Sequence, residues 1–216
     1  MDLARARDIM VESQVRTSDV TDLRILRAMR TLPRERFAPA QKRSLAYADL
    51  ELEVSAGRTL MRPHDLAKLI QALAPQPHER ALEIAGATGY GAAVLAACCK
   101  SVVTLDPDPD LSFAARAALE SCGVNTVKTV STAVADGWKD EAPYDVILLN
   151  GGAEVVPDAW LAQLAPGGRL GVIVREGAAG KARIYTRAEE AVAFRVEFDA
   201  FPGVVPGLHR SRVFTF

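Results

Sequence analysis

The chain has 216 residues and a mass of 23.2 kDa, which is the size of one domain or of one domain with a small addition. Hydrophobic residues make up 49% of the chain and charged residues 25%, so the disordered, collagen-like and coiled-coil classes are excluded. The formal net charge is -1, and nothing in this balance favours nucleic acid or an acidic membrane as a partner.

The first fifty residues are predicted to be helical. A helix capped by Asp2 is expected to run to about residue 15, and a second helix, over residues 23–31, can be capped by Thr21 or Asp22. Residues 1–43 carry ten Lys/Arg against six Asp/Glu at helical spacing, which is typical of a solvated face. A further helix begins at Pro63 and presents leucines on one face. Residues 1–78 are therefore predicted to form an N-terminal helical cap, separate from a second unit over residues 79–216.

From about residue 80 onward, short apolar runs alternate with helical stretches. The predicted strands are residues 81–84, 101–105, 124–130, 145–149 and 168–174, and the predicted helices are residues 90–98, 109–121 and 157–164. This alternation predicts a doubly wound α/β fold, with a parallel sheet and helices on both faces. Residues 182–186, 193–198 and 212–216 alternate in polarity and are expected to extend one edge of the sheet in antiparallel fashion.

The sequence contains no sign of a metal centre or a hydrolase triad. The three cysteines offer no C-x-x-C pair, and the three histidines are widely separated. No apolar run approaches the roughly 20 residues that a bilayer requires, and the N-terminus has no signal-peptide core. We therefore expect a cytoplasmic protein without a bound metal.

A glycine-containing turn follows the first predicted strand of the alternating region. The run Leu82-Glu-Ile-Ala-Gly-Ala-Thr-Gly-Tyr-Gly91 opens the next helix, where backbone N–H groups can approach a ligand closely. Asp106 ends the next strand, about twenty residues on, where a carboxylate can accept hydrogen bonds from both ribose hydroxyls of a nucleoside. Together they indicate a nucleoside site. The alternative is a turn used for packing and a solvated Asp106.

With these motifs the chain resembles the protein-L-isoaspartate O-methyltransferase family, a branch of the class I S-adenosylmethionine-dependent methyltransferases. The resemblance is carried in order by Met10-Val-Glu-x-Gln14, Pro33-Arg-Glu-Arg-Phe37, Ala46-Tyr47, Gly57-x-Thr59-x-x-x-Pro63, Leu82-Glu-Ile with Gly89-Tyr90, Ala142-Pro-Tyr-Asp145, and Pro157 with Gln163-Leu and Gly167-Gly-Arg-Leu170. It implies a mostly parallel, seven-stranded Rossmann-like methyltransferase sheet with an antiparallel C-terminal edge. It also implies methyl transfer to L-isoaspartyl carboxylates in damaged proteins or peptides, a protein repair reaction.

The resemblance also implies a set of site residues. The cofactor, S-adenosylmethionine, would be bound by Glu83, Ala85, Gly86, Ala87, Gly89, Asp106, Ala133 and Asn150. Residues 58–61 would lie over the transferred methyl group, with Thr59 and Met61 as the candidate catalytic residues. The segment Asn150-Gly-Gly152 either faces the methyl group or is a plain tight turn.

Several positions depart from the family pattern. Ala85 and Ala87 stand at its first two glycines, where a positive φ would cost an alanine about 1 to 2 kcal/mol. Ala133 stands where the family has the acid that faces the adenine, and Arg58 and Met61 replace its glutamine and serine. Two alternatives follow: a methyltransferase with a different acceptor, or a degenerate, non-catalytic member that no longer binds the cofactor.

Overall fold

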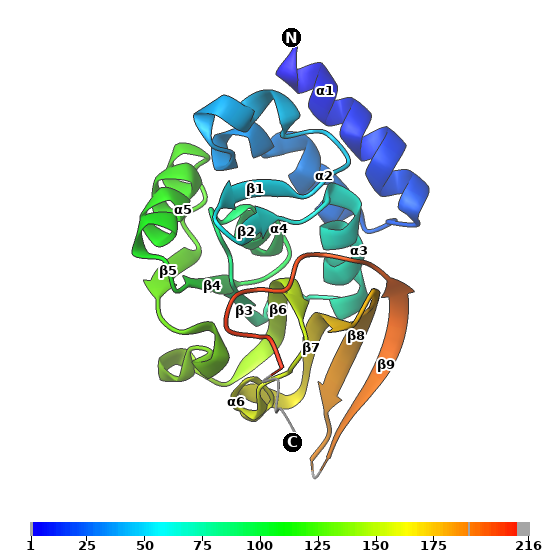
Figure 1. Cartoon of the computed structure of the whole chain (residues 1–216), viewed down its shortest axis with the longest axis vertical. Helices are drawn as coiled ribbons and strands as arrows, with labels where there is room; N and C mark the ends of the chain where they lie inside the picture. The colour runs from blue at the N-terminus through cyan, green and yellow to red at the C-terminus, as the bar shows by residue number, and fades with distance from the viewer. Residues whose placement is uncertain (1, 190, 211–216) are drawn as a thin grey trace, which may run out of the picture.

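The computed structural model describes residues 2–189 and 191–210, and its centre is a seven-stranded sheet (Figure 1). The strands are β3 (Arg80–Ile84), β4 (Ser101–Asp106), β5 (Val127–Ser131), β6 (Tyr144–Ala153), β7 (Leu164–Glu176), β8 (Ala179–Arg187) and β9 (Val192–Asp199). Their order is β5-β4-β3-β6-β7-β8-β9. The strands from β5 to β7 are parallel, whereas β8 and β9 pair antiparallel at one edge. The predicted fold class is confirmed.

Helices cover the two faces of the sheet. They are α3 (Pro63–Leu73), α4 (Tyr90–Ala96), α5 (Pro109–Ser121) and α6 (Asp158–Ala162). Neighbouring strand residues point to opposite faces, so Leu82 and Ile84 belong to one buried cluster and Ala81 to another. Both faces of β3 and β6 are therefore buried, as expected of a parallel sheet between two helical layers.

The N-terminal segment packs above this sheet (Figure 1). It contains α1 (Leu3–Met10), continued by the helical turns η1 (Val11–Val15) and η2 (Arg16–Ser18), then α2 (Leu23–Thr31), η3 (Arg34–Phe37) and η4 (Ala40–Leu45). A small antiparallel hairpin, β1 (Leu52–Ser55) and β2 (Arg58–Leu60), follows. The pattern of residues 52–60 did not predict this hairpin, because its strands have only four and three residues and show no alternation long enough to detect.

Most predicted elements of the sheet region are confirmed, with shifts at their ends. The strand predicted from residue 124 begins at Val127, because Gly123, at φ 70°, closes the last turn of α5 and Val124 still donates to Leu119 O. The helix predicted over 157–164 stops at Ala162, because β7 begins at Leu164. The strand predicted over 212–216 lies outside the described residues. Short turns η5 (Val134–Asp136) and η6 (Lys139–Glu141) link β5 to β6.

One return segment brings the C-terminal part of the chain back to the centre of the sheet. After β9, residues 200–208 run back toward β6 and β3, drawn in red in Figure 1. Gly152 N donates to Gly203 O at 2.9 Å, and Val205 N donates to Gly152 O at 2.9 Å. This return segment therefore lies against the carboxyl end of β6. Among the described residues, no helix combines the length and apolar composition needed to cross a membrane.

Candidate functional site

The turn after β3 adopts the backbone that a glycine motif would favour. Ala85 has φ 59° and Ala87 has φ 51°, both in the left-handed region. Gly86 N donates to Leu105 O at 2.9 Å, and Gly89 N donates to Gly86 O at 2.8 Å. The chain thus keeps this turn although each left-handed alanine costs about 1 to 2 kcal/mol.

Glu83 lies beneath this turn with its carboxylate fully buried. Thr104 Oγ1 donates to Glu83 Oε2 at 2.7 Å, whereas Oε1 has no hydrogen-bond partner among the described residues. A Cβ on Gly86 or on Gly91 would collide with this carboxylate, so both glycines make room for it. Burial raises the pKa of Glu83 to about 8, which places its titration near neutral pH.

Asp106 ends β4 beside the turn, and its carboxylate is held entirely by groups of the chain itself. Oδ2 accepts a hydrogen bond from Ala87 N at 2.9 Å and forms an ion pair with Arg58 Nη2. Oδ1 accepts from Asp108 N at 3.2 Å. Arg58 Nη2 also donates to Ala85 O at 2.6 Å, and both members of the ion pair are buried. The guanidinium therefore bridges the turn and the acid that were predicted to hold a ribose.

Asn150 occupies the neighbouring strand end. It follows Leu149, which pairs with Ile84, so it lies level with the start of the turn. Its side chain is buried, and Oδ1 has no hydrogen-bond partner within the described part of the chain. The segment Asn150-Gly-Gly152 belongs to β6 rather than to an open turn. Ala133, by contrast, is exposed, directly before η5.

The two predicted catalytic residues, Thr59 and Met61, lie in different environments. Thr59 is half-buried, and its Oγ1 donates to Glu51 Oε1 at 3.4 Å. Burial raises the pKa of Glu51, which also accepts from Gly203 N at 3.2 Å. Met61 is buried in the core, so the structure does not bring its side chain together with Thr59 in one open site.

Arg34 is a buried charge to which the sequence analysis assigned no role. Its guanidinium donates from Nε to Ala46 O and from Nη2 to Met61 O, each at 2.8 Å, and lies 4.6 Å from the centre of the Tyr90 ring. Burial lowers the pKa of Arg34. The only signal for this residue was its place in the motif at residues 33–37. It fixes the segment before β1 against α4.

The predicted cofactor crevice is closed in this arrangement. Every residue from 81 to 95 is buried, including the whole turn, and so are Asp106 and Asn150. On the β6 side, the return segment places Val205 so near Gly151 that a Cβ there would lie 2.7 Å from Val205 Cγ2. Arg58 and the return segment therefore cover the strand ends where a nucleoside was expected.

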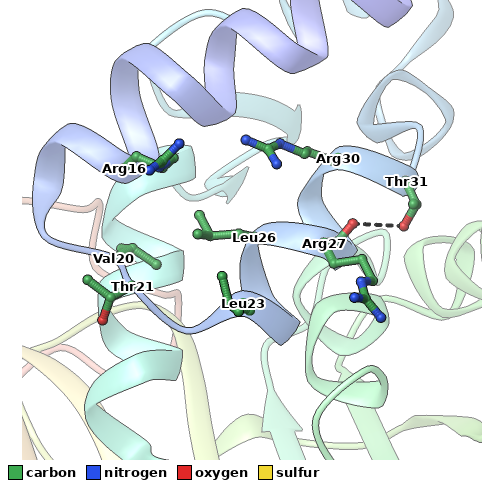
Figure 2. Close-up of a pocket in the computed structure, with 8 residues that line it drawn as sticks. All are labelled: Arg16, Val20, Thr21, Leu23, Leu26, Arg27, Arg30 and Thr31. Atoms are coloured by element: carbon green, nitrogen blue, oxygen red, sulfur yellow. Dashed lines mark hydrogen bonds between the residues drawn. The ribbon is translucent and has the colours of Figure 1, made fainter.

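An open groove lies elsewhere, on the N-terminal segment (Figure 2). It has a volume of about 550 Å³ and is lined by Arg16, Val20, Thr21, Leu23, Leu26, Arg27, Arg30 and Thr31. Glu12 forms ion pairs with both Arg16 and Arg30, and these pairs neutralise part of the positive charge of the groove. None of its lining residues is one of those named at the strand-end crevice. Within the described residues, no cluster of three or more His, Cys, Asp or Glu side chains could hold a metal ion.

Comparisons with known proteins agree on one family. Residues 5–199 match the family model of protein-L-isoaspartate(D-aspartate) O-methyltransferase. The chain is 39% identical over 173 residues to protein-L-isoaspartate O-methyltransferase 1 of Syntrophobacter fumaroxidans, covering 79% of each chain. It is 41% identical over 169 residues to the protein-L-isoaspartate O-methyltransferase of Methylorubrum populi, covering 78% of each chain.

Solved structures show the same fold. A protein-L-isoaspartate O-methyltransferase structure, 24% identical, superposes with a TM-score of 0.80 over 94% of this chain and 66% of its own length, so the chain spans about two thirds of that protein. A putative protein-L-isoaspartate O-methyltransferase from Plasmodium falciparum, solved in complex with S-adenosyl-L-homocysteine, is 17% identical and superposes with a TM-score of 0.79. That alignment covers 92% of this chain and 97% of the other.

Proposed function

This chain belongs to the protein-L-isoaspartate O-methyltransferase family, and on that premise we propose that it methylates the side-chain carboxylate of L-isoaspartyl residues with S-adenosylmethionine. Methylation of that carboxylate would start the repair of damaged proteins or peptides in the cytoplasm. The net charge of -1 gives no electrostatic reason to expect nucleic acid or an acidic membrane as the acceptor.

The observation that carries this proposal is a pair of side-chain oxygens without hydrogen-bond partners at the carboxyl ends of β3 and β6. Glu83 Oε1 and Asn150 Oδ1 are buried and lack hydrogen-bond partners among the described residues. Buried polar groups are nearly always paired, so these two oxygens are available to accept hydrogen bonds from a ligand. Together with Asp106 at the end of β4, these oxygens fit the hydroxyl and ammonium donors of S-adenosylmethionine.

Each residue would contact the part of the cofactor that the family pattern implies. Asp106 would hold the ribose, Glu83 and residues 86–89 the methionine and ribose portions, and Ala133 the neighbourhood of the adenine. Asn150 would lie near the methyl group. Thr59, at the half-buried edge beside Glu51, would contact the acceptor. Because Met61 lies in the core, we propose a packing role for it under this contact.

The chemistry requires little beyond orientation. The bound cofactor would supply an electrophilic methyl group to the acceptor. A free carboxyl group with a pKa near 4 is already ionised at neutral pH, so the protein need not supply a general base. Alignment of the two groups and exclusion of water can contribute roughly 7 to 11 kcal/mol in favourable cases.

The test is transfer of a labelled methyl group from S-adenosylmethionine to a synthetic isoaspartyl peptide. The same peptide with ordinary aspartate is the matched control, because it differs only in the linkage. We expect base-labile label in the isoaspartyl peptide alone. A cell extract is assayed in parallel with the same labelled cofactor. If metabolites of the extract become labelled while the isoaspartyl peptide does not, the acceptor is a different molecule.

A non-catalytic role is the second candidate, and the closed crevice is the observation that favours it. The Arg58–Asp106 ion pair and the buried turn cover the strand ends where a nucleoside would bind. Isothermal titration with S-adenosylhomocysteine separates the two. No heat at millimolar ligand, with the wild type and with variants that open the crevice, would favour the non-catalytic role.

A further inference from the structure

We infer that Arg58 is a displaceable occupant of the nucleoside position and thereby sets the cofactor affinity of this chain. The inference rests on the proposed function, because it assumes that Asp106 is the acid that receives ribose hydroxyls. In this arrangement, the guanidinium of Arg58 holds that acid. A nucleoside with vicinal hydroxyls would bind only after the guanidinium leaves.

The contacts show direct competition for the same acceptor. Asp106 Oδ2 already accepts from Arg58 Nη2 and from Ala87 N, and Oδ1 accepts from Asp108 N. The Arg58 side chain is 6% exposed and Asp106 is 2% exposed, so both members of the pair are buried. Ribose hydroxyls would therefore have to replace the arginine, not be added to it.

The closed arrangement is imperfectly satisfied, which makes the arginine displaceable. Arg58 Nε, Glu83 Oε1 and Asn150 Oδ1 are buried without hydrogen-bond partners in the described structure. A buried polar group without a partner destabilises the state that contains it. A polar ligand that pairs with these atoms would favour the open state.

The element that carries Arg58 is small. Arg58 begins β2, a three-residue strand paired only with β1 in a two-stranded sheet. Leu52, Leu60 and Met61 anchor this hairpin in the core. The turn residue Gly57 packs on Pro206, where an added Cβ would lie 3.1 Å from Pro206 Cγ. The hairpin is therefore held in place, and displacement of Arg58 would be a rotation of its long side chain.

The test is calorimetric binding of S-adenosylhomocysteine to the full chain. Arg58→Gln removes the ion pair and installs the residue expected from the family pattern, while Arg62→Gln makes the same change at an exposed arginine four residues on. We expect the dissociation constant to fall at least about tenfold in R58Q, because the binding-competent fraction rises, and to stay within about twofold in R62Q. Equal or weaker binding by R58Q would overturn the inference.

Two further measurements cover a variant that does not fold. Arg58→Lys keeps a positive charge beside Asp106 but offers no planar fork, and we expect it to bind at least about threefold more tightly than the wild type. In the wild type, saturation with S-adenosylhomocysteine should speed solvent exchange of the Arg58 side-chain N–H protons. Unchanged affinity or unchanged exchange would refute displacement.

The outcomes also separate this inference from the proposed function. Tighter binding by R58Q without methyl transfer to the isoaspartyl peptide would keep the inference and refute the function. Methyl transfer by the wild type, with R58Q and wild type binding alike, would keep the function and refute the inference.

Discussion

Arg58 and Asp106 lie 48 residues apart in the sequence, yet their side chains meet in a buried ion pair at the carboxyl end of β4. Removing one partner of such a pair leaves an uncompensated buried charge, which typically costs about 3 to 5 kcal/mol. The pair therefore covers the end of β4, and each member needs the other to compensate its buried charge.

We expect Asp106→Ala to lower the free energy of unfolding by about 3 to 5 kcal/mol, measured by urea denaturation. Asp136→Ala, at an exposed aspartate, should change it by less than about 0.5 kcal/mol. The double variant Arg58→Met/Asp106→Leu should lose less than the two single losses added together, because neither charge remains unpaired. Strict additivity would show that the pair is not coupled.

Restoring glycine at residues 85 and 87 should raise affinity for S-adenosylhomocysteine with little change in stability. Each replacement relieves left-handed strain of about 1 to 2 kcal/mol. Two costs offset this gain: the greater conformational entropy that glycine loses on folding, about 0.5 to 1 kcal/mol, and the loss of one buried methyl group, about 0.8 kcal/mol. Titration calorimetry of Ala85→Gly/Ala87→Gly should therefore show tighter binding at a nearly unchanged urea midpoint.

Ala93→Gly provides the control for that pair. Ala93 is buried inside α4, so its replacement should destabilise the fold by about 1 kcal/mol or more without improving binding. If the double glycine variant binds no better than the wild type, the two methyl groups are not the obstacle.

Glu83 should make the wild type lose stability as pH rises. Its pKa in the folded chain is about 8, against an ordinary 4.5, so between these values the folded state holds a proton that the unfolded chain has released. The stabilisation is complete below about pH 4.5 and is lost as pH rises through about 8, by up to roughly 1.4 kcal/mol per pH unit.

Urea midpoints of wild type and Glu83→Gln between pH 5 and 8 measure this loss. Glutamine does not titrate, so the variant should become more stable relative to the wild type as pH rises. Glu120→Gln, at an exposed glutamate, should track the wild type throughout. Parallel profiles for wild type and E83Q would contradict a raised pKa at this carboxyl.

Gly91→Ala should destabilise the fold because its Cβ would collide with the Glu83 carboxylate. Overpacking of this kind costs about 1 to 3 kcal/mol, and thermal unfolding should report it. Gly203→Ala is the control, because the nearest atom to a Cβ there is 4.0 Å away. In the Glu83→Ala background the cost of G91A should largely disappear. A cost that persists would place the strain elsewhere in α4.

The sequence predicted most helices and strands well because periodicity and caps are local signals. Helix α2 begins after Asp22 and α5 covers residues 109–121 as expected, with Arg24 N and Asp110 N bonded to their cap carboxylates. It failed for residues 52–60, whose hairpin packs on the core and contacts the return segment, and these tertiary contacts leave no local pattern in the sequence.

The residues of the site were predictable in kind, but their mutual arrangement was not. Asp106 and the turn do meet, as the spacing of strand, turn and strand indicated. The spacing could not predict that Arg58 lies between them, because Arg58 is held by Asp106, which is 48 residues away in the sequence. The left-handed backbone of Ala85 and Ala87 was likewise only a conditional expectation until the turn itself was seen.

Val205 and Leu208 belong to the same buried cluster as Leu82, Ile84 and Trp160. The sheet face that begins to form with β3 is therefore completed only by residues more than a hundred positions later. During synthesis, the ribosome must release residues 204–208 before this layer can close. Until then the nascent chain exposes an unfinished apolar surface, the kind of surface that chaperones bind.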